Sequence, residues 1–277
     1  MAKTQQIEPR FRTIDGLNVR YAESAHRDTD ALLLSPWPES VYAYDQTWSQ
    51  LGADTHLVAI DLPGFGKSQR RDEMMSPHAM GEFIVRVADE FGLDQPHVVG
   101  PDVGTGTALF AAANHPGRLR SLVVGSGASS VPITLEGPLR DWVLSPTVDE
   151  FRKVDGREIV SAALGTIQGY ELPGEIREDY LASYEGERFV ESMSYARAYP
   201  EDLPVLRDLL PNLETPVEII AGRDDRAVPP SNAEFLHDRL PHSKLDLLDA
   251  AHFAWEEAPS TYADVVTTWW NGGFKKV

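Results

Sequence analysis

The chain contains no cysteine among its 277 residues. It therefore cannot form disulfides, thiolate nucleophiles or cysteine-ligated metal sites, and a reducing compartment suits it. It also lacks any apolar run close to the roughly 18 residues that a membrane-spanning helix needs. Residues 1–13 are too polar for a signal peptide. We therefore expect a cytoplasmic protein that does not enter a membrane.

Basic residues are scarce as well: 25 Lys and Arg stand against 43 Asp and Glu, giving a formal net charge of −18. Nucleic acids and anionic membranes are bound through clustered Lys and Arg, so neither partner is expected. The histidines show no ligand spacing with paired carboxylates, so we expect no metal and no other cofactor. The expected partner is a small, neutral and apolar substrate. The sequence leaves a monomer and a homodimer equally open.

Short apolar segments recur along the chain and end in turn-forming residues, as buried strands of a parallel sheet do. Helical patterns at 76–94 and 107–117 stand between them, and Ser76 and Pro77 are suited to begin the first of these helices. The alternation predicts an α/β fold with a doubly wound, mostly parallel sheet. The apolar segments are 31–36, 56–61, 97–100, 119–127, 216–225 and 244–252.

Between residues 130 and 212 the pattern changes. This stretch is charged, amphipathic and helical, and it contains no convincing strand. We expect a helical cap insertion over 130–212, with residues 1–129 and 213–277 forming one core.

The segment HVVGPDVGTG, residues 97–106, places Asp102 between Gly100 and Gly104 at the end of an apolar run. A nucleophile between two glycines, after a strand and before a helix, is the pattern of the nucleophile elbow, a tight turn that requires small neighbours. A helix cap is the competing interpretation of Asp102. The glycine spacing does not match a dinucleotide fingerprint.

The chain resembles the α/β-hydrolase superfamily, in its branch with an aspartate nucleophile. The resemblance covers nearly the whole length, through SPWP (35–38), DLPGFGKS (61–68), the elbow, GRDDRAVPP (222–230) and AHFAWEEAP (251–259). It implies a triad in the order of that fold: Asp102 as nucleophile, Asp225 as acid and His252 as base. Asp224 is the less favoured choice for the acid.

An aspartate nucleophile is already ionised at neutral pH and suits displacement at a saturated carbon, which leaves an alkyl ester. His252, oriented by Asp225, would activate the water that hydrolyses this ester. With an ordinary pKa near about 6.5, it would be neutral above that pH. The resemblance implies an oxyanion hole formed by the backbone N–H groups of Val103 and Trp37.

Within this branch, epoxide hydrolases protonate the leaving alkoxide with tyrosines of the cap. The segment MSYARAYP (193–200) resembles the end of that cap and favours Tyr195 as the donor, with Tyr199 or Tyr170 as alternatives. Haloalkane dehalogenases commonly hold halide with a Trp after the nucleophile, where this chain has Val103. Fluoroacetate dehalogenases use arginines on the elbow helix, where it has Val103 and Gly106. An epoxide hydrolase is therefore the leading prediction.

Two other classes remain open. The same scaffold can carry a non-hydrolytic lyase or cyclase with Asp102 as base, or a binding protein without turnover. Any of these functions needs an apolar pocket, for which the sequence offers aromatic candidates. The candidates are Trp37, Phe110, Trp142, Tyr170, Tyr199 and Phe253.

Overall fold

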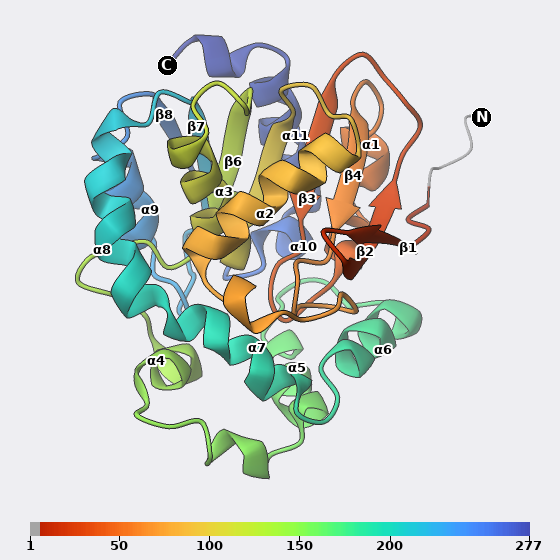
Figure 1. The fold of residues 1–277 in the computed structure, drawn as a ribbon, viewed down its shortest axis with the longest axis vertical. Helices are drawn as coiled ribbons and strands as arrows, with labels where there is room; N and C mark the ends of the chain where they lie inside the picture. Colours follow the sequence, from red (N-terminus) through yellow and green to blue (C-terminus); the bar gives the residue numbers. More distant parts are fainter. Residues whose placement is uncertain (1–5) are drawn as a thin grey trace.

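The computed structural model describes residues 6–277 and contains one eight-stranded sheet in the order β1-β2-β4-β3-β5-β6-β7-β8 (Figure 1). Strands β3 to β8 are parallel to one another, while β2 runs antiparallel to β1 and β4. The predicted mostly parallel α/β sheet is confirmed. The strands are β1 (Arg10–Ile14), β2 (Leu17–Glu23), β3 (Asp30–Leu34), β4 (His56–Ile60), β5 (His97–Pro101), β6 (Ser121–Gly125), β7 (Val217–Gly222) and β8 (Ser243–Leu248).

The hairpin of β1 and β2 is the part of the sheet that the apolar runs did not predict. Asp15 and Gly16 form its turn with φ angles of 49° and 75°. An Asp-Gly pair is a strong hairpin signal, because this turn requires positive φ at both central residues. β1 is largely exposed and β2 mixes exposed with buried residues, so neither strand is a continuous apolar segment in the sequence.

Both faces of the sheet are covered by helices, and successive strand residues contribute to opposite cores. Leu32 and Leu34 of β3 pack in a cluster with Phe83 and Phe110, whereas Leu33 packs in a second cluster with aromatic residues near the C-terminus. The first cluster involves α2 (Pro77–Glu90) and α3 (Val103–Asn114), and the second involves α11 (Pro259–Trp270). Burial on both faces explains why the central strands are apolar throughout.

The two predicted helices are present, but α2 ends earlier than predicted, at Glu90, and both ends of α3 differ from the prediction. Ser76 caps α2 by accepting a hydrogen bond from the Ala79 N–H, and Pro77 is the first helical residue. Helix α3 begins at Val103 instead of near residue 107. Its first turn contains Gly104 and Gly106. Because glycine is a poor helix former, the sequence did not indicate that the helix begins this early. A Cβ at either glycine would press on a neighbouring segment, so packing requires small residues here.

Between β6 and β7 the described chain forms helices and no strand, and α4 to α7 lie together below the sheet in Figure 1. The division of the chain at residues 130 and 212 stays a prediction. Within residues 6–277, no helix is both long and apolar enough to cross a membrane. Residues 1–5 of the polar N-terminal stretch lie outside the described part. The helices are α4 (Gly137–Leu144), α5 (Gly156–Leu164), α6 (Gly174–Ser183), α7 (Arg188–Arg197) and α8 (Tyr199–Leu209).

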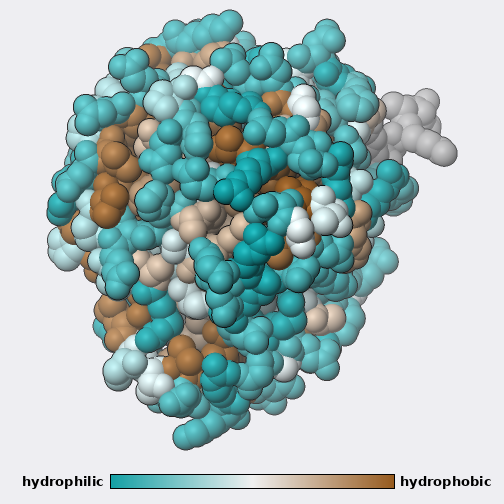
Figure 2. All heavy atoms as spheres, viewed as in Figure 1, coloured by the Kyte–Doolittle hydropathy of each residue, from teal (hydrophilic) through white to brown (hydrophobic). Residues whose placement is uncertain are grey.

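The surface in Figure 2 is mostly hydrophilic, with apolar residues in small separate groups. Three of the few large apolar side chains that are strongly exposed belong to the segment between β6 and β7: Leu144, Val154 and Val205.

Candidate active site

Asp102 occupies the turn between β5 and α3 in a strained backbone conformation, with φ of 52° and ψ of −120°. Non-glycine residues rarely adopt positive φ, and such strain is typical of functional turns. The neighbours leave no room for larger residues: a Cβ at Gly100 would lie 2.5 Å from the carbonyl oxygen of Gly104. The turn therefore has the geometry expected of an elbow.

The carboxylate of Asp102 faces backbone N–H groups rather than capping its helix. It makes no capping hydrogen bond, so the helix-cap interpretation is wrong. Its Oδ2 accepts a hydrogen bond of 2.7 Å from the Trp37 N–H, and it is also hydrogen-bonded to the Val103 backbone. These are the two donors that the resemblance implied. The side chain is buried, since the residue is only 6 % exposed.

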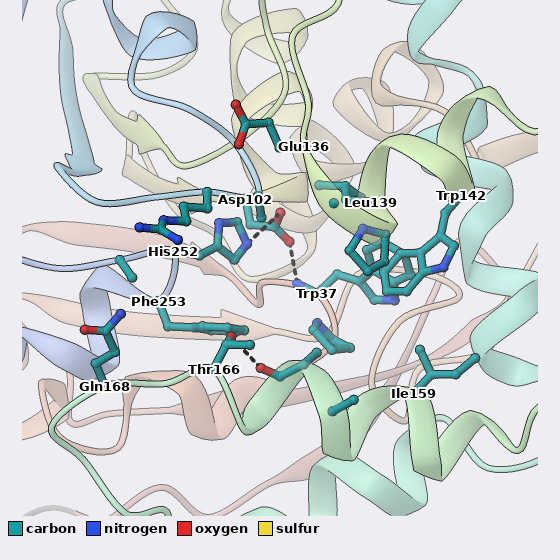
Figure 3. Close-up of a pocket in the computed structure, with 18 of the residues that line it drawn as sticks. Trp37, Asp102, Glu136, Leu139, Trp142, Ile159, Thr166, Gln168, His252 and Phe253 are labelled. Atoms are coloured by element: carbon teal, nitrogen blue, oxygen red, sulfur yellow. Dashed lines mark hydrogen bonds and ion pairs between the residues drawn. The ribbon is translucent and has the colours of Figure 1, made fainter.

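His252 connects Asp102 to a second carboxylate, as Figure 3 shows in part. Its Nδ1 lies 2.8 Å from Asp225 Oδ2, and its Nε2 lies 3.9 Å from Asp102 Oδ1. The other oxygen of Asp225 accepts hydrogen bonds of 2.9 Å from the N–H groups of Ala227 and Val228, which fix its orientation. The structure thus brings together the three residues of the implied triad, whereas Asp224 is exposed on the rim.

Burial and charge act in opposite directions on these groups. Burial disfavours the imidazolium of His252, but the nearby charges of Asp225, Asp102 and Glu257 outweigh it and raise the pKa of His252 to about 9. Burial also raises the pKa of Asp102, an effect opposed by His252 and by the two backbone hydrogen bonds. His252 is therefore protonated at neutral pH, in contrast to the expectation of an ordinary imidazole pKa.

A cavity of about 990 Å³ opens in front of this group. Trp37, Trp142 and Phe253 line it, as the sequence predicted, together with Asp102 and His252 (Figure 3). Much of the remaining wall comes from α4, α5 and the segment after α5, which sequence reasoning did not identify. These additional residues include Leu139, Val154, Ile159, Ala162, Ala163, Thr166 and Gln168.

Charged residues also line this cavity, and most of them are acidic. Glu136, Glu158 and Asp224 accompany Asp102, whereas Arg226 is the one Lys or Arg in its wall. Such a wall disfavours an anionic ligand.

The predicted tyrosine donors do not line the cavity. Tyr195 is fully buried, and its hydroxyl lies 2.6 Å from the carbonyl oxygen of Val103 and 2.7 Å from Thr107 Oγ1. The hydroxyl of Tyr195 on α7 therefore bonds to α3, the helix that follows the elbow, and does not face the cavity. Tyr199 packs edge-on against Tyr195, and Tyr170 is absent from the wall as well. The roles predicted for these three residues in catalysis and substrate binding stay predictions that the wall of this cavity does not support.

Phe110, the remaining aromatic candidate, is also absent from the wall. It is buried on α3 and stacks on His78, with ring centroids 4.8 Å apart. Phe110 is therefore a residue of the hydrophobic core and does not contact the cavity.

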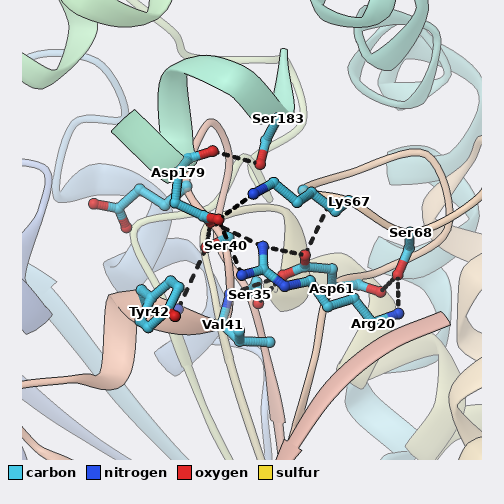
Figure 4. Close-up of polar contacts among 12 residues, drawn as sticks. Arg20, Ser35, Ser40, Val41, Tyr42, Asp61, Lys67, Ser68, Asp179 and Ser183 are labelled. Atoms are coloured by element: carbon cyan, nitrogen blue, oxygen red, sulfur yellow. Dashed lines mark hydrogen bonds and ion pairs between the residues drawn. The ribbon is translucent and has the colours of Figure 1, made fainter. Parts of the chain in front are cut away.

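A buried polar cluster connects α6 to the loop that carries Trp37 (Figure 4). Asp179 accepts two hydrogen bonds from Arg20, of 2.8 and 3.0 Å, and a third of 2.8 Å from Ser40 Oγ. Lys67 is also bonded to Asp179. Sequence reasoning missed this cluster, because Asp179 lies more than 100 residues from each of its partners and the charged members resemble solvated surface residues.

A second buried carboxylate holds the same loop. Asp61 accepts hydrogen bonds of 2.7 Å from the Val41 N–H and 3.0 Å from Ser35 Oγ. Asp61 and Asp179 together fix the chain on both sides of Trp37, and this determines where its N–H points. Burial raises the pKa of Asp61 against the opposing charge of Arg20.

Comparisons with known proteins agree with the fold. Residues 32–259 match the family model described as alpha/beta hydrolase fold. A 2-hydroxymuconate semialdehyde hydrolase from Pseudomonas sp. strain CF600 is 29 % identical over 229 residues, covering 78 % of this chain and 77 % of that protein.

Two solved structures illustrate the likeness in three dimensions. Cfl2 from Burkholderia cenocepacia has a TM-score of 0.82 at 20 % identity, with 97 % of each chain covered. The epoxide hydrolase CorEH has a TM-score of 0.80 at 18 % identity, covering 96 % of this chain and 99 % of that one. At such identities the likeness concerns the fold alone.

Proposed function

Because this chain belongs to the alpha/beta hydrolase fold family and is a hydrolase, we propose that it opens a small, neutral epoxide through an alkyl ester of Asp102. The observation that carries the proposal is a carboxylate at the elbow position, held by the Trp37 and Val103 backbone and paired with His252. A carboxylate in this position can displace a leaving group from a saturated carbon without prior deprotonation.

In the first step, Asp102 Oδ1 bonds to an epoxide carbon and that carbon's bond to the ring oxygen breaks. The ring oxygen keeps the electron pair but stays attached through the neighbouring carbon. It therefore remains near Oδ1, which lies 3.9 Å from His252 Nε2. Because the pKa of His252 is about 9, its imidazolium can donate the proton that we first assigned to a tyrosine.

In the second step, the now neutral His252 takes a proton from water, and the hydroxide attacks Cγ of Asp102. The negative charge develops on Oδ2, towards which the Trp37 and Val103 N–H groups are directed. When the bond between Cγ and Oδ1 breaks, His252 returns its proton to the departing diol oxygen. Asp102 is left as a carboxylic acid that carries the second proton of the water, and transfer of this proton to His252 restores both the imidazolium and the carboxylate.

The charge of the cavity wall supports a neutral substrate. The 2-hydroxymuconate semialdehyde hydrolase, by its name, acts on a carboxylate, and this wall holds several acidic residues against one arginine. A neutral epoxide and its diol product avoid that repulsion.

Trapping the ester tests this function. His252→Gln should accumulate an adduct on Asp102 that intact mass spectrometry detects after incubation with an epoxide panel. A single turnover of the wild type in ¹⁸O-water should place the label in Asp102. Asp102→Ala should abolish turnover, since losing a nucleophile costs many orders of magnitude. An unlabelled Asp102, or activity above about one per cent in Asp102→Ala, would rule the covalent route out.

The pH dependence tests the two roles of His252. Ester formation needs the imidazolium, so its rate should fall as the pH rises through about 9. Ester breakdown needs the neutral imidazole, so its rate should rise with pH. Its midpoint should lie below that of formation, because an esterified Asp102 no longer raises the pKa of His252. Rapid-mixing measurements separate the two phases; parallel profiles would contradict the dual role.

A haloalkane is the second candidate substrate. The indole Nε1 of Trp37 has no hydrogen-bond partner among the described residues, and Trp37 lines the cavity. A halide leaves without a proton, so His252→Gln should leave alkylation by a haloalkane unchanged. The same variant should slow alkylation by an epoxide about ten- to a thousandfold, the contribution of one positioned acid. Adducts formed only from haloalkanes would replace the epoxide proposal with dehalogenation.

A further inference from the structure

A group of metal-ligating side chains lies at the edge of the sheet opposite the active site. Asp30 and His56 are the first residues of β3 and β4, while Glu23 is the last residue of the antiparallel β2. His26 follows in the loop from residue 24 to 29. Asp102 and His252 instead follow the carboxyl ends of parallel strands, so this group is separate from the proposed chemistry.

His56 is buried and held between two carboxylates. Its Nδ1 lies 2.8 Å from Asp30 Oδ1, and its Nε2 lies 3.1 Å from Glu23 Oε1. The ring of His26 lies against that of His56 at an angle of 34°, with centroids 4.3 Å apart. Ligand atoms of Glu23, His26 and His56 all lie within 4.8 Å of one another.

The contact with Asp30 fixes how His56 can act. A carboxylate accepts the Nδ1–H, which leaves a lone pair on Nε2. That lone pair would then face an oxygen of Glu23 at 3.1 Å, which is repulsive unless a proton or a metal ion lies between the two atoms. Two ligands of a tetrahedral zinc ion, at bonds of about 2.0–2.1 Å, lie roughly 3.3 Å apart. The observed separation is therefore close to that of two zinc ligands.

We propose that Glu23, His26 and His56 bind a divalent transition-metal ion such as Zn²⁺, with Asp30 orienting His56. Imidazole and carboxylate donors favour Zn²⁺, Ni²⁺ or Cu²⁺ over Mg²⁺ and Ca²⁺, which prefer oxygen ligands alone. The ion would tie the loop from 24 to 29 to the start of β4. The spacing in the sequence hides this site, because His56 lies 30 residues beyond His26.

Calorimetric titration of the chelator-treated protein with zinc chloride tests the proposal. The wild type should bind one ion saturably and should melt at a higher temperature with zinc, because the ion binds only the folded chain. His26→Ala and Glu23→Gln change exposed residues and should abolish both effects while leaving the fold intact. Asp30→Ala, which removes the orienting carboxylate, should weaken binding about ten- to a hundredfold.

His237→Ala is the matched control. His237 is an exposed histidine whose Nδ1 lies 2.9 Å from Ser243 Oγ, and its replacement should leave zinc binding unchanged. If the wild type binds no zinc saturably, the proposal is overturned. The contact between Glu23 and His56 is then a hydrogen bond with a shared proton. Zinc binding that survives both His26→Ala and Glu23→Gln would overturn it as well.

Discussion

Helices α4 and α5 line the cavity mostly with apolar side chains, whereas α6 and α7 are joined to the rest of the core by a buried carboxylate and a buried hydroxyl. Leu139 and Trp142 of α4 and Ile159 of α5 line the cavity. Asp179 of α6 and Tyr195 of α7 instead bond to the core and contribute nothing to the cavity wall. One half of the helical segment, α4 and α5, thus lines the cavity, and the other half, α6 and α7, bonds to the backbone and side chains near Trp37 and Val103.

The contacts of α4 and α5 also differ from those of α6 and α7 in how strongly their energy depends on direction. Apolar contacts are non-directional, so residues of α4 and α5 can be exchanged at the cost of packing alone. A buried ion pair is directional, and removing one partner leaves an uncompensated charge. We therefore expect substitutions in the first half to change which substrate is used, and substitutions in the second half to change stability and catalysis of every substrate.

Asp179→Ala should produce the largest effect. Arg20 and Lys67 would lose their shared partner, and Arg20 is buried, so the free energy of unfolding should fall by about 3–5 kcal/mol. Urea denaturation measures the loss. Glu178→Gln, one residue earlier on α6, breaks only an exposed pair with Arg157 and should leave stability unchanged. Equal losses in the two variants would contradict the distinction between the halves.

Ile159→Ala should have an intermediate effect, confined to substrate choice. Removing apolar contact from a binding wall costs about 1–3 kcal/mol for a substrate that fills the space, or roughly ten- to two-hundredfold in kcat/KM. The fall in kcat/KM should be largest for long-chain substrates, while the rate of ester breakdown stays constant. Leu144→Ala is the control, because Leu144 of α4 is 54 % exposed and does not line the cavity. A uniform loss for all chain lengths would show that α5 also positions the chemistry.

Tyr195→Phe should have the smallest effect. It removes the hydroxyl that bonds to Val103 and Thr107, which costs about 0.5–1.5 kcal/mol of stability. Ester formation from an epoxide should keep its wild-type rate in single-turnover experiments, since this hydroxyl does not reach the cavity. A tenfold slower alkylation would restore Tyr195 as the proton donor and remove that role from His252.

The sequence predicted the polar end of the site well, because its residues follow strands. Asp102, Asp225 and His252 each stand just beyond an apolar run, and parallel strands carry such positions to one edge of a sheet. The two backbone donors were predicted from the resemblance to the α/β-hydrolase superfamily. Neither inference required knowledge of how side chains pack.

The apolar end of the site could not be predicted in this way. Five tyrosines of the helical segment look alike in sequence, and only tertiary packing decides which face of each helix meets the sheet. Tyr184, for example, donates to the carbonyl oxygen of Glu39 and is fully buried. The wall that does surround the cavity uses alanines and aliphatic residues of α5, which carry no chemical signal.

The strand order has a consequence for how this enzyme can change over evolutionary time. Trp37 follows β3 and Val103 follows β5, and these two strands are direct neighbours in the sheet. Neighbouring strands are spaced about 4.7–4.9 Å apart by their own hydrogen bonds. The distance between the two N–H donors is therefore set by the backbone hydrogen bonds between β3 and β5. Substitutions of side chains in the cavity wall leave this distance unchanged. On the proposed function, substitutions in α4 and α5 can therefore change the substrate while the two N–H donors keep their positions.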